Sequence, residues 1–237
     1  MSLIFLLAAS LAAAAPATPR PSPASTCPQV VTPEALVCDA FQAEKNGDHA
    51  GAAQAFEEAA KASSDKDPKA ARMWAAAGNL WIAARQPAKA AVDLDKSLAL
   101  PGLEAEQRGE ALLDRARAAE AQDDLKTARA KANEAGQTIS ADPFYWYFSA
   151  ALAIRENDPE SAQKAIDKAL ALAPSDPTVL FEAGHVADLM GDDERARSYW
   201  TRAAASDPDG DSGKAAAKAI ELLGVTPTVK LDPQPPK

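Results

Sequence analysis

The side chains best suited to chemistry in this chain are two histidines and the carboxylates beside them. His49 follows Asp48 in a predicted turn, and Glu182, His185 and Asp188 fall at i, i+3 and i+6 of a predicted helix. That spacing places the three on one helix face, as a catalytic or metal site or as the polar lining of a groove. A zinc site needs three or four convergent protein ligands. No such cluster is visible, so we interpret these three residues as groove lining.

The remaining motifs do not predict a reaction. The sequence contains no nucleophile elbow, no glycine-rich phosphate loop and no carboxylate cluster anchored by histidine. Asp and Glu are abundant, but abundance alone does not create a general acid. We therefore predict no catalytic residue, no metal site and no cofactor.

The N-terminal residues are typical of an export signal. Leu3 to Ala15 is almost unbroken apolar sequence, and Ala15-Pro16-Ala17 offers a small-x-small cleavage site. Such a run is short for a bilayer span but suits a secretory signal, so we predict a signal peptide over residues 1–17. No Lys or Arg precedes the run, so either the true start lies upstream or the signal is atypical. A buried N-terminal helix is the alternative.

Export would take both cysteines of the chain into an oxidising compartment, the periplasm or the outside of the cell. Two cysteines in such a compartment usually pair, so we predict a disulfide between Cys27 and Cys38. A lipid anchor on Cys27 fits less well, because Ala24-Ser25-Thr26 lies far from the apolar run. After signal cleavage, no membrane span is expected.

A repeated unit of 34 residues organises most of the chain. Five stretches superimpose on one template and begin at Pro33, Ala71, Gly109, Pro143 and Pro177. The fourth position of each copy is large and apolar: Leu36, Trp74, Leu112, Trp146 and Leu180. The twentieth is always alanine: Ala52, Ala90, Ala128, Ala162 and Ala196. Alanine columns could arise by chance, since 58 of 237 residues are Ala. Bulky and small positions alternate at fixed offsets, however, and turn residues recur at one place, which composition alone does not require.

The pattern resembles the tetratricopeptide repeat, a 34-residue helix–turn–helix unit. The fifth copy carries it most clearly, with Leu180, Gly184, Ala196, Trp200 and Pro208 where that family has its signature residues. The resemblance implies an all-α, right-handed solenoid of about five repeats over residues 33–224, closed by a capping helix at 214–223. The third copy is weakest, with Ala132 at a usually bulky position. Copies one and two each have four extra residues, which we assign to the turns Ser63–Ala70 and Pro101–Arg108.

The resemblance also implies a concave binding surface, which the first helix of each pair would line. The family's groove offsets fall on Val37 and Phe41; Arg72, Asn79 and Ile82; Leu113 and Arg117; Phe144, Tyr147 and Ile154; and Phe181 and His185. Val37 and Phe41 occupy positions where some members hold a partner's terminal carboxylate with Lys and Asn. A helical or extended apolar segment is therefore the expected ligand.

Five consecutive aromatic residues, Phe144 to Phe148, stand out in a chain that is only 5% aromatic. The template places Trp146 in the core, and a helix cannot bury the other four together. We therefore predict that Phe144, Tyr147 and Phe148 reach the groove, where aromatic side chains are effective anchors. The alternative is that these aromatics pack against the short side chains of repeat three, around Ala132.

Charge and composition limit the classes of partner that this chain is expected to bind. A formal charge of −9 disfavours nucleic acid and anionic membranes, which call for basic surfaces. Residues 18–32 are expected to be a Pro/Ser-rich linker, and 225–237, with four prolines, a disordered tail. The sequence thus favours a cell-envelope scaffold that binds a partner protein or peptide. A structural or self-associating envelope subunit is the main alternative, and a cell-wall enzyme is a minor one.

Overall fold

The computed structural model describes residues 27–28, 30–64 and 66–223, which form eleven helices and contain no strand. The expected all-α solenoid is confirmed. The helices are α1 (Pro33–Lys45), α2 (His49–Ala62), α3 (Pro68–Ala83), α4 (Pro87–Ala99), α5 (Ala105–Glu120), α6 (Leu125–Ile139), α7 (Pro143–Arg155), α8 (Pro159–Leu172), α9 (Pro177–Leu189), α10 (Asp193–Ser206) and α11 (Asp211–Leu223).

Capping side chains explain where most helices begin. At the start of α1–α3 and α6–α10, a Thr or Asp side chain accepts a hydrogen bond from a backbone N–H of the first turn. Asp142, for example, accepts from the N–H of Phe144 at 2.8 Å. The first turn of α1, α3, α7 and α9 contains a proline. Proline lacks a backbone N–H, but no helical hydrogen bond is lost, because N–H groups of the first turn have no partner within the helix.

The turn inside each helix pair repeats one backbone conformation. A single residue with positive φ lies in each of these five turns: Gly47, Arg85, Asp123, Asn157 and Gly191. Consecutive members of this set are 38, 38, 34 and 34 positions apart. These intervals equal the spacing of the sequence repeats, so the register deduced from the sequence holds through all five pairs.

The extra residues of repeats one and two lie mainly in helices and not in turns. The helix α3 begins at Pro68 and α5 at Ala105, ahead of the expected starts at Ala71 and Gly109. Both have 16 residues, whereas α1, α7 and α9 have 13. Capping explains the difference. Asp67 caps the early start of α3, and a capping box formed by Glu104 and Gln107 caps the early start of α5. The helix α11 likewise begins at Asp211, three residues before the expected capping helix.

Small residues bring paired helices together. Gly78 in α3 faces Leu94 in α4, and a Cβ on Gly78 would lie 2.5 Å from the Leu94 Cγ. Gly184 in α9 leaves room in the same way for Trp200 in α10. The buried side chains form four clusters that follow the chain from α1 to α11. Each repeat therefore packs on its neighbours, as a solenoid requires.

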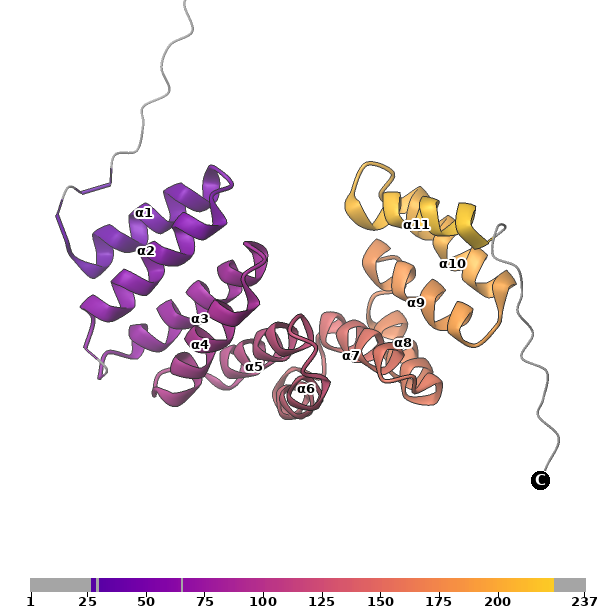
Figure 1. Cartoon of the computed structure of the whole chain (residues 1–237), viewed down its shortest axis with the longest axis horizontal. Helices are drawn as coiled ribbons and strands as arrows, with labels where there is room; N and C mark the ends of the chain where they lie inside the picture. Colours follow the sequence, from indigo (N-terminus) through magenta and orange to yellow (C-terminus); the bar gives the residue numbers. More distant parts are fainter. Residues whose placement is uncertain (1–26, 29, 65, 224–237) are drawn as a thin grey trace, which may run out of the picture.

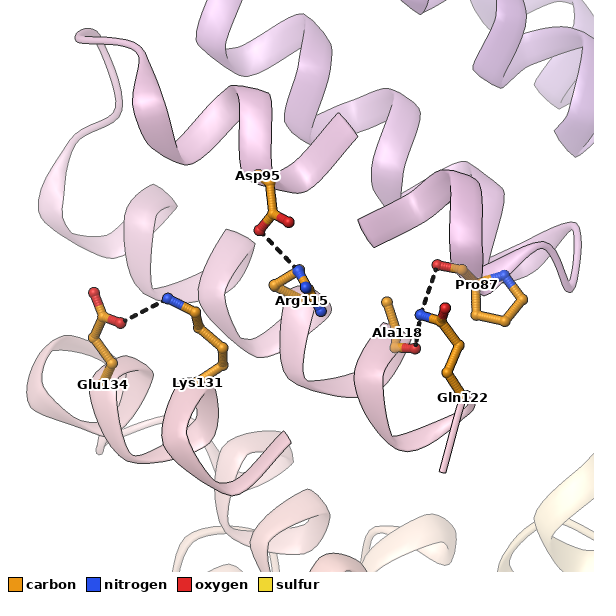
Figure 2. Close-up of polar contacts among 7 residues, drawn as sticks. All are labelled: Pro87, Asp95, Arg115, Ala118, Gln122, Lys131 and Glu134. Atoms are coloured by element: carbon orange, nitrogen blue, oxygen red, sulfur yellow. Dashed lines mark hydrogen bonds and ion pairs between the residues drawn. The ribbon is translucent and has the colours of Figure 1, made fainter. Parts of the chain in front are cut away.

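The helices follow one another in an open arch, with α3, α5, α7 and α9 on its inner side (Figure 1). Polar contacts also join the second and third repeats (Figure 2). Arg115 in α5 donates to Asp95 in α4 at 2.8 Å, and Gln122 donates to the carbonyl of Pro87 at 3.4 Å. The Lys131–Glu134 pair, 3.1 Å apart, lies within α6.

The entry segment is tied to the first helix. Cys27 forms a disulfide with Cys38 in α1, and their Cα atoms are 5.6 Å apart. The expected signal peptide, most of the linker and the expected C-terminal tail lie outside the described residues. None of the helices in the described ranges combines the length and the hydrophobicity that a bilayer span requires.

Candidate functional site

Three pockets adjoin along the inner side of the arch, and we call them together the inner groove. The N-terminal pocket lies between α1 and α3, the central pocket spans α3, α5 and α7, and the C-terminal pocket spans α5, α7 and α9. Arg72 lines both the N-terminal and central pockets, and Arg117 lines both the central and C-terminal ones. The two arginines therefore mark the junctions of a continuous surface that crosses five repeats.

The N-terminal pocket, about 520 Å³ in volume, is mainly apolar. Phe41 is 58% exposed and packs edge-on against Phe56, with ring centroids 5.6 Å apart. Val37 and Met73 complete its apolar wall, and Arg72 stands at its rim. Among the described residues, the Arg72 guanidinium has no ion pair or hydrogen bond. This pocket can accept an apolar side chain, with a free cation beside it.

The central pocket, about 480 Å³, contains a chain of contacts through three repeats. Asn79 in α3 donates to Asp114 in α5 at 2.8 Å, and Asp114 accepts from Arg117 at 2.8 Å. The Arg117 guanidinium lies 5.3 Å from the ring centroid of Phe144 in α7. Phe144 in turn packs against Tyr147, with ring centroids 5.3 Å apart. The neighbouring side chains thus fix Arg117 and Phe144 as part of the groove wall.

Acidic side chains also line the central pocket: Glu110, Asp114 and Asp142. Partial burial, together with the negative charges of Glu106, Asp114 and Asp142, raises the pKa of the otherwise exposed Glu110 above its ordinary value. Glu110 has no ion pair among the described residues. The central pocket therefore combines the unpaired carboxyl group of Glu110 with two arginines, of which Arg117 is paired with Asp114 and Arg72 has no partner among the described residues.

The C-terminal pocket, about 410 Å³, mixes aromatic and charged side chains. Arg155 in α7 pairs with Glu120 in α5 and with Asp123. Glu182 and His185 in α9 face this pocket, and Tyr147 lies on its wall. Burial raises the pKa of Tyr147, and the nearby charge of Glu182 raises it further. The sequence interpretation of Glu182 and His185 as groove lining agrees with this position, while Asp188 does not line the pocket.

Most residues selected from the sequence meet in the inner groove. Those that line its pockets are Val37, Phe41, Arg72, Asn79, Ile82, Leu113, Arg117, Phe144, Tyr147, Phe148, Ile154 and His185. Leu113 is only 3% exposed, so it supports the surface more than it presents a contact. Phe181 lies outside the three pockets and packs against His185, with ring centroids 4.3 Å apart.

The aromatic run is oriented differently from the expectation. Phe148 is only 6% exposed and Tyr145 only 8%, so both belong to the core, whereas Trp146 is half-buried. Tyr145 packs over Gly136, where a Cβ would collide with its ring. The indole of Trp146 donates to the carbonyl of Ser140 at 2.7 Å, in the turn before α7. Phe148 therefore forms part of the pocket floor and is not an exposed anchor.

Several groove residues on α5 were not selected from the sequence. Gln107, Glu110 and Asp114 line the central pocket together with Arg117. These polar residues recur at intervals of three and four, the spacing of one helix face. That spacing was a usable signal, but the expected helix start at Gly109 excluded the first of them. No group of His, Cys, Asp and Glu suited to a metal occurs within the described ranges.

Solved structures similar to this chain include proteins with tetratricopeptide repeats. YrrB, a TPR protein with an unusual peptide-binding site, has a TM-score of 0.56 and 16% identity over 79% of this chain and 91% of that chain. PilW, a type IV pilus biogenesis factor, has a TM-score of 0.65 and 16% identity over 78% and 82%. A tetratricopeptide repeat protein from Parabacteroides merdae has a TM-score of 0.61 and 13% identity over 81% and 73%. No protein-family model and no curated protein matches the sequence. At these identities the similarity concerns the fold.

Proposed function

We propose, from the tetratricopeptide-repeat fold of this chain, that it is a non-enzymatic scaffold that binds a segment of a partner protein in the inner groove. The observation that carries the proposal is the joining of three pockets through Arg72 and Arg117. A partner segment would lie along α1, α3, α5, α7 and α9 and place side chains in successive pockets.

The chemistry of the groove suits recognition of a chain segment. Phe41 offers an apolar contact at one end, and Phe144 a second one near the middle. Arg117 already lies close to Phe144, which limits the entropy lost when a partner packs against both. Among similar structures, YrrB has a peptide-binding site, which supports the same use of this fold.

We further propose that the protein works in the cell envelope. The Cys27–Cys38 disulfide supports an oxidising compartment. The apolar run Leu3–Ala15 supports export. The similar structure PilW is named as a pilus biogenesis factor, which is compatible with an envelope role.

Partner capture tests the groove. Full-length protein would be used to purify partners from an envelope extract, and each partner's affinity would then be measured with purified components. The double variant F144A/Y147A should lose binding, and R72E should weaken it without altering helicity, because Arg72 is exposed and has no partner among the described residues. Unchanged affinity in both variants would contradict the proposal.

A matched control removes exposed apolar side chains elsewhere. Leu172 and Met190 are 46% and 51% exposed and line none of the three pockets. The variant L172A/M190A should therefore bind as the wild type does. Circular dichroism of every variant shows whether the solenoid is intact, so that a folding defect is not mistaken for a binding defect.

A further inference from the structure

Glu182 is a buried carboxylate at the C-terminal pocket of the inner groove. Its side chain is 9% exposed and lines a cavity of about 410 Å³. Among the described residues, no hydrogen bond reaches this carboxylate, and the imidazole Nδ1 of His185 lies 3.5 Å from one of its oxygens. The oxygens of Glu182 are not among the fully buried unpaired polar atoms of the described residues, so the charge is open to the pocket and not sealed in the core. Glu182 therefore occupies a position that favours a cationic ligand.

The cations around this pocket are already engaged. Arg117 pairs with Asp114. Arg155 pairs with Glu120 and with Asp123. His185 carries a positive charge only when its imidazole is protonated. The chain itself therefore leaves the charge of Glu182 without a permanent counterion.

Aromatic rings complete the surroundings of Glu182. Tyr147 lines the pocket from α7 and His185 from α9, and Phe148 lies at its floor. Aromatic faces attract cations, most strongly where water is excluded. Burial raises the pKa of Tyr147, and the charge of Glu182 adds to the rise. A carboxylate among aromatic rings is an environment that selects lysine and arginine side chains.

We infer that the C-terminal pocket receives a lysine or arginine side chain of the partner segment, with the carboxylate of Glu182 as its counterion. This inference rests on the proposed function, because it assigns one chemical feature to the segment in the groove. It predicts that the partner carries a basic residue near the end of the segment that contacts α9.

Small probes test the pocket without a known partner. N-acetyl-lysine methylamide and N-acetyl-arginine methylamide would be titrated into the full chain at about pH 8, where imidazoles are neutral, and followed by NMR signals of His185. Both probes should give saturable shifts, and N-acetyl-glutamine methylamide should give none. The variant E182Q should weaken binding of the basic probes by about tenfold or more.

Glu58→Gln is the matched control, because Glu58 in α2 is exposed and lines none of the three pockets. E58Q should keep wild-type shifts. E182Q should remain folded and melt no lower than the wild type, since an amide of the same shape replaces a buried charge. Equal shifts with the glutamine probe, wild-type affinity in E182Q, or no shift with any probe would each overturn the inference.

Partner binding separates this inference from the proposed function. F144A/Y147A could release a captured partner while E182Q binds it as tightly as the wild type. That result would support partner binding in the inner groove and overturn the inference that a basic side chain of the partner pairs with Glu182. Loss of affinity in both variants, together with the probe shifts, supports both.

Discussion

The amide of Asn79 in α3 donates to the carboxylate of Asp114 in α5 at 2.8 Å. The other oxygen of Asp114 accepts from Arg117, which lies over the ring of Phe144 in α7. One carboxylate thus connects side chains from three successive repeats. It also holds Arg117 where the central and C-terminal pockets meet. The shape of the groove therefore depends on a residue that need not touch the partner.

Replacing Asp114 with alanine should lower both stability and partner affinity. The change leaves Asn79 and Arg117 without their shared acceptor, which costs about 1 kcal/mol and lowers Tm by about 2–4 °C. Thermal unfolding by circular dichroism measures this loss. Asp39→Ala is the control, because exposed Asp39 in α1 gains the same helix propensity but has no contact to lose. Equal melting of the two variants would show that the bridge does not stabilise the groove.

Replacing Gly184 with alanine should destabilise the fifth repeat. The new Cβ would occupy the space filled by the indole of Trp200 and disturb its hydrogen bond to the carbonyl of Phe181, which is 3.0 Å long. Overpacking of this kind costs about 1–3 kcal/mol. Hydrogen exchange should therefore speed up in α9 and α10 but not in α1–α4. A variant that exchanges as slowly as the wild type would contradict the close packing described for this pair.

Asp93 in α4 is a buried carboxyl group outside the groove. It is 2% exposed; one oxygen accepts from Lys96 at 3.0 Å, and the other has no hydrogen-bond partner among the described residues. Burial raises its pKa above the ordinary 3.8, Lys96 opposes the rise, and the charge of Glu57 adds to it. The folded state therefore keeps this proton at pH values where the unfolded chain has lost it. The protonated carboxyl group of Asp93 therefore stabilises the folded state fully below pH 3.8, and this contribution is lost as the pH rises through the raised pKa.

The variant D93N should consequently melt higher than the wild type at pH 7, by several degrees if the charge costs about 1 kcal/mol or more. The difference should shrink as pH falls toward the ordinary Asp value, because the wild-type carboxyl then becomes neutral as well. Thermal melts at a series of pH values measure this difference. A gap that stays constant from pH 7 to pH 4 would mean that the charge of Asp93 is not the cause.

Reduction of the Cys27–Cys38 disulfide should loosen the first repeat. A bridge that closes so short a loop contributes about 2–3 kcal/mol, and in a solenoid such a loss remains close to its origin. Amide hydrogen exchange in α1 should therefore become faster after reduction, while exchange in α7–α11 stays unchanged. Equal protection of α1 in the oxidised and reduced protein would show that the bridge does not support this helix.

Repeat spacing was sufficient to predict the fold, because it recurs independently in the turns. In all five pairs the positive-φ residue lies where the sequence places turn residues: Gly47, Arg85, Asp123, Asn157 and Gly191. Starts of α3 and α5 were less predictable. Caps such as Asp67 start the helix before the first position of the 34-residue template. A periodic pattern does not show how inserted residues divide between helix and loop.

The repeat template predicts a groove residue only where it determines which face of the helix points toward the groove. Arg72, Asn79 and Arg117 were selected from their offsets and do line the pockets. The aromatic run has no apolar–polar alternation, so periodicity could not decide which rings face the core. The space above Gly136 admits Tyr145, and this contact between α6 and α7 is not encoded in the local pattern.

Site-specific photo-crosslinking tests the central claim most directly. A photoreactive residue at Glu110, which is exposed and lines the central pocket, is compared with one at Lys168, which is exposed on α8 and lines none of the three pockets. Each protein is irradiated with the same purified partner. Our account predicts crosslinks from position 110 and none from position 168. Crosslinks from position 168 without any from position 110 would place the partner off the inner groove and contradict the proposed function.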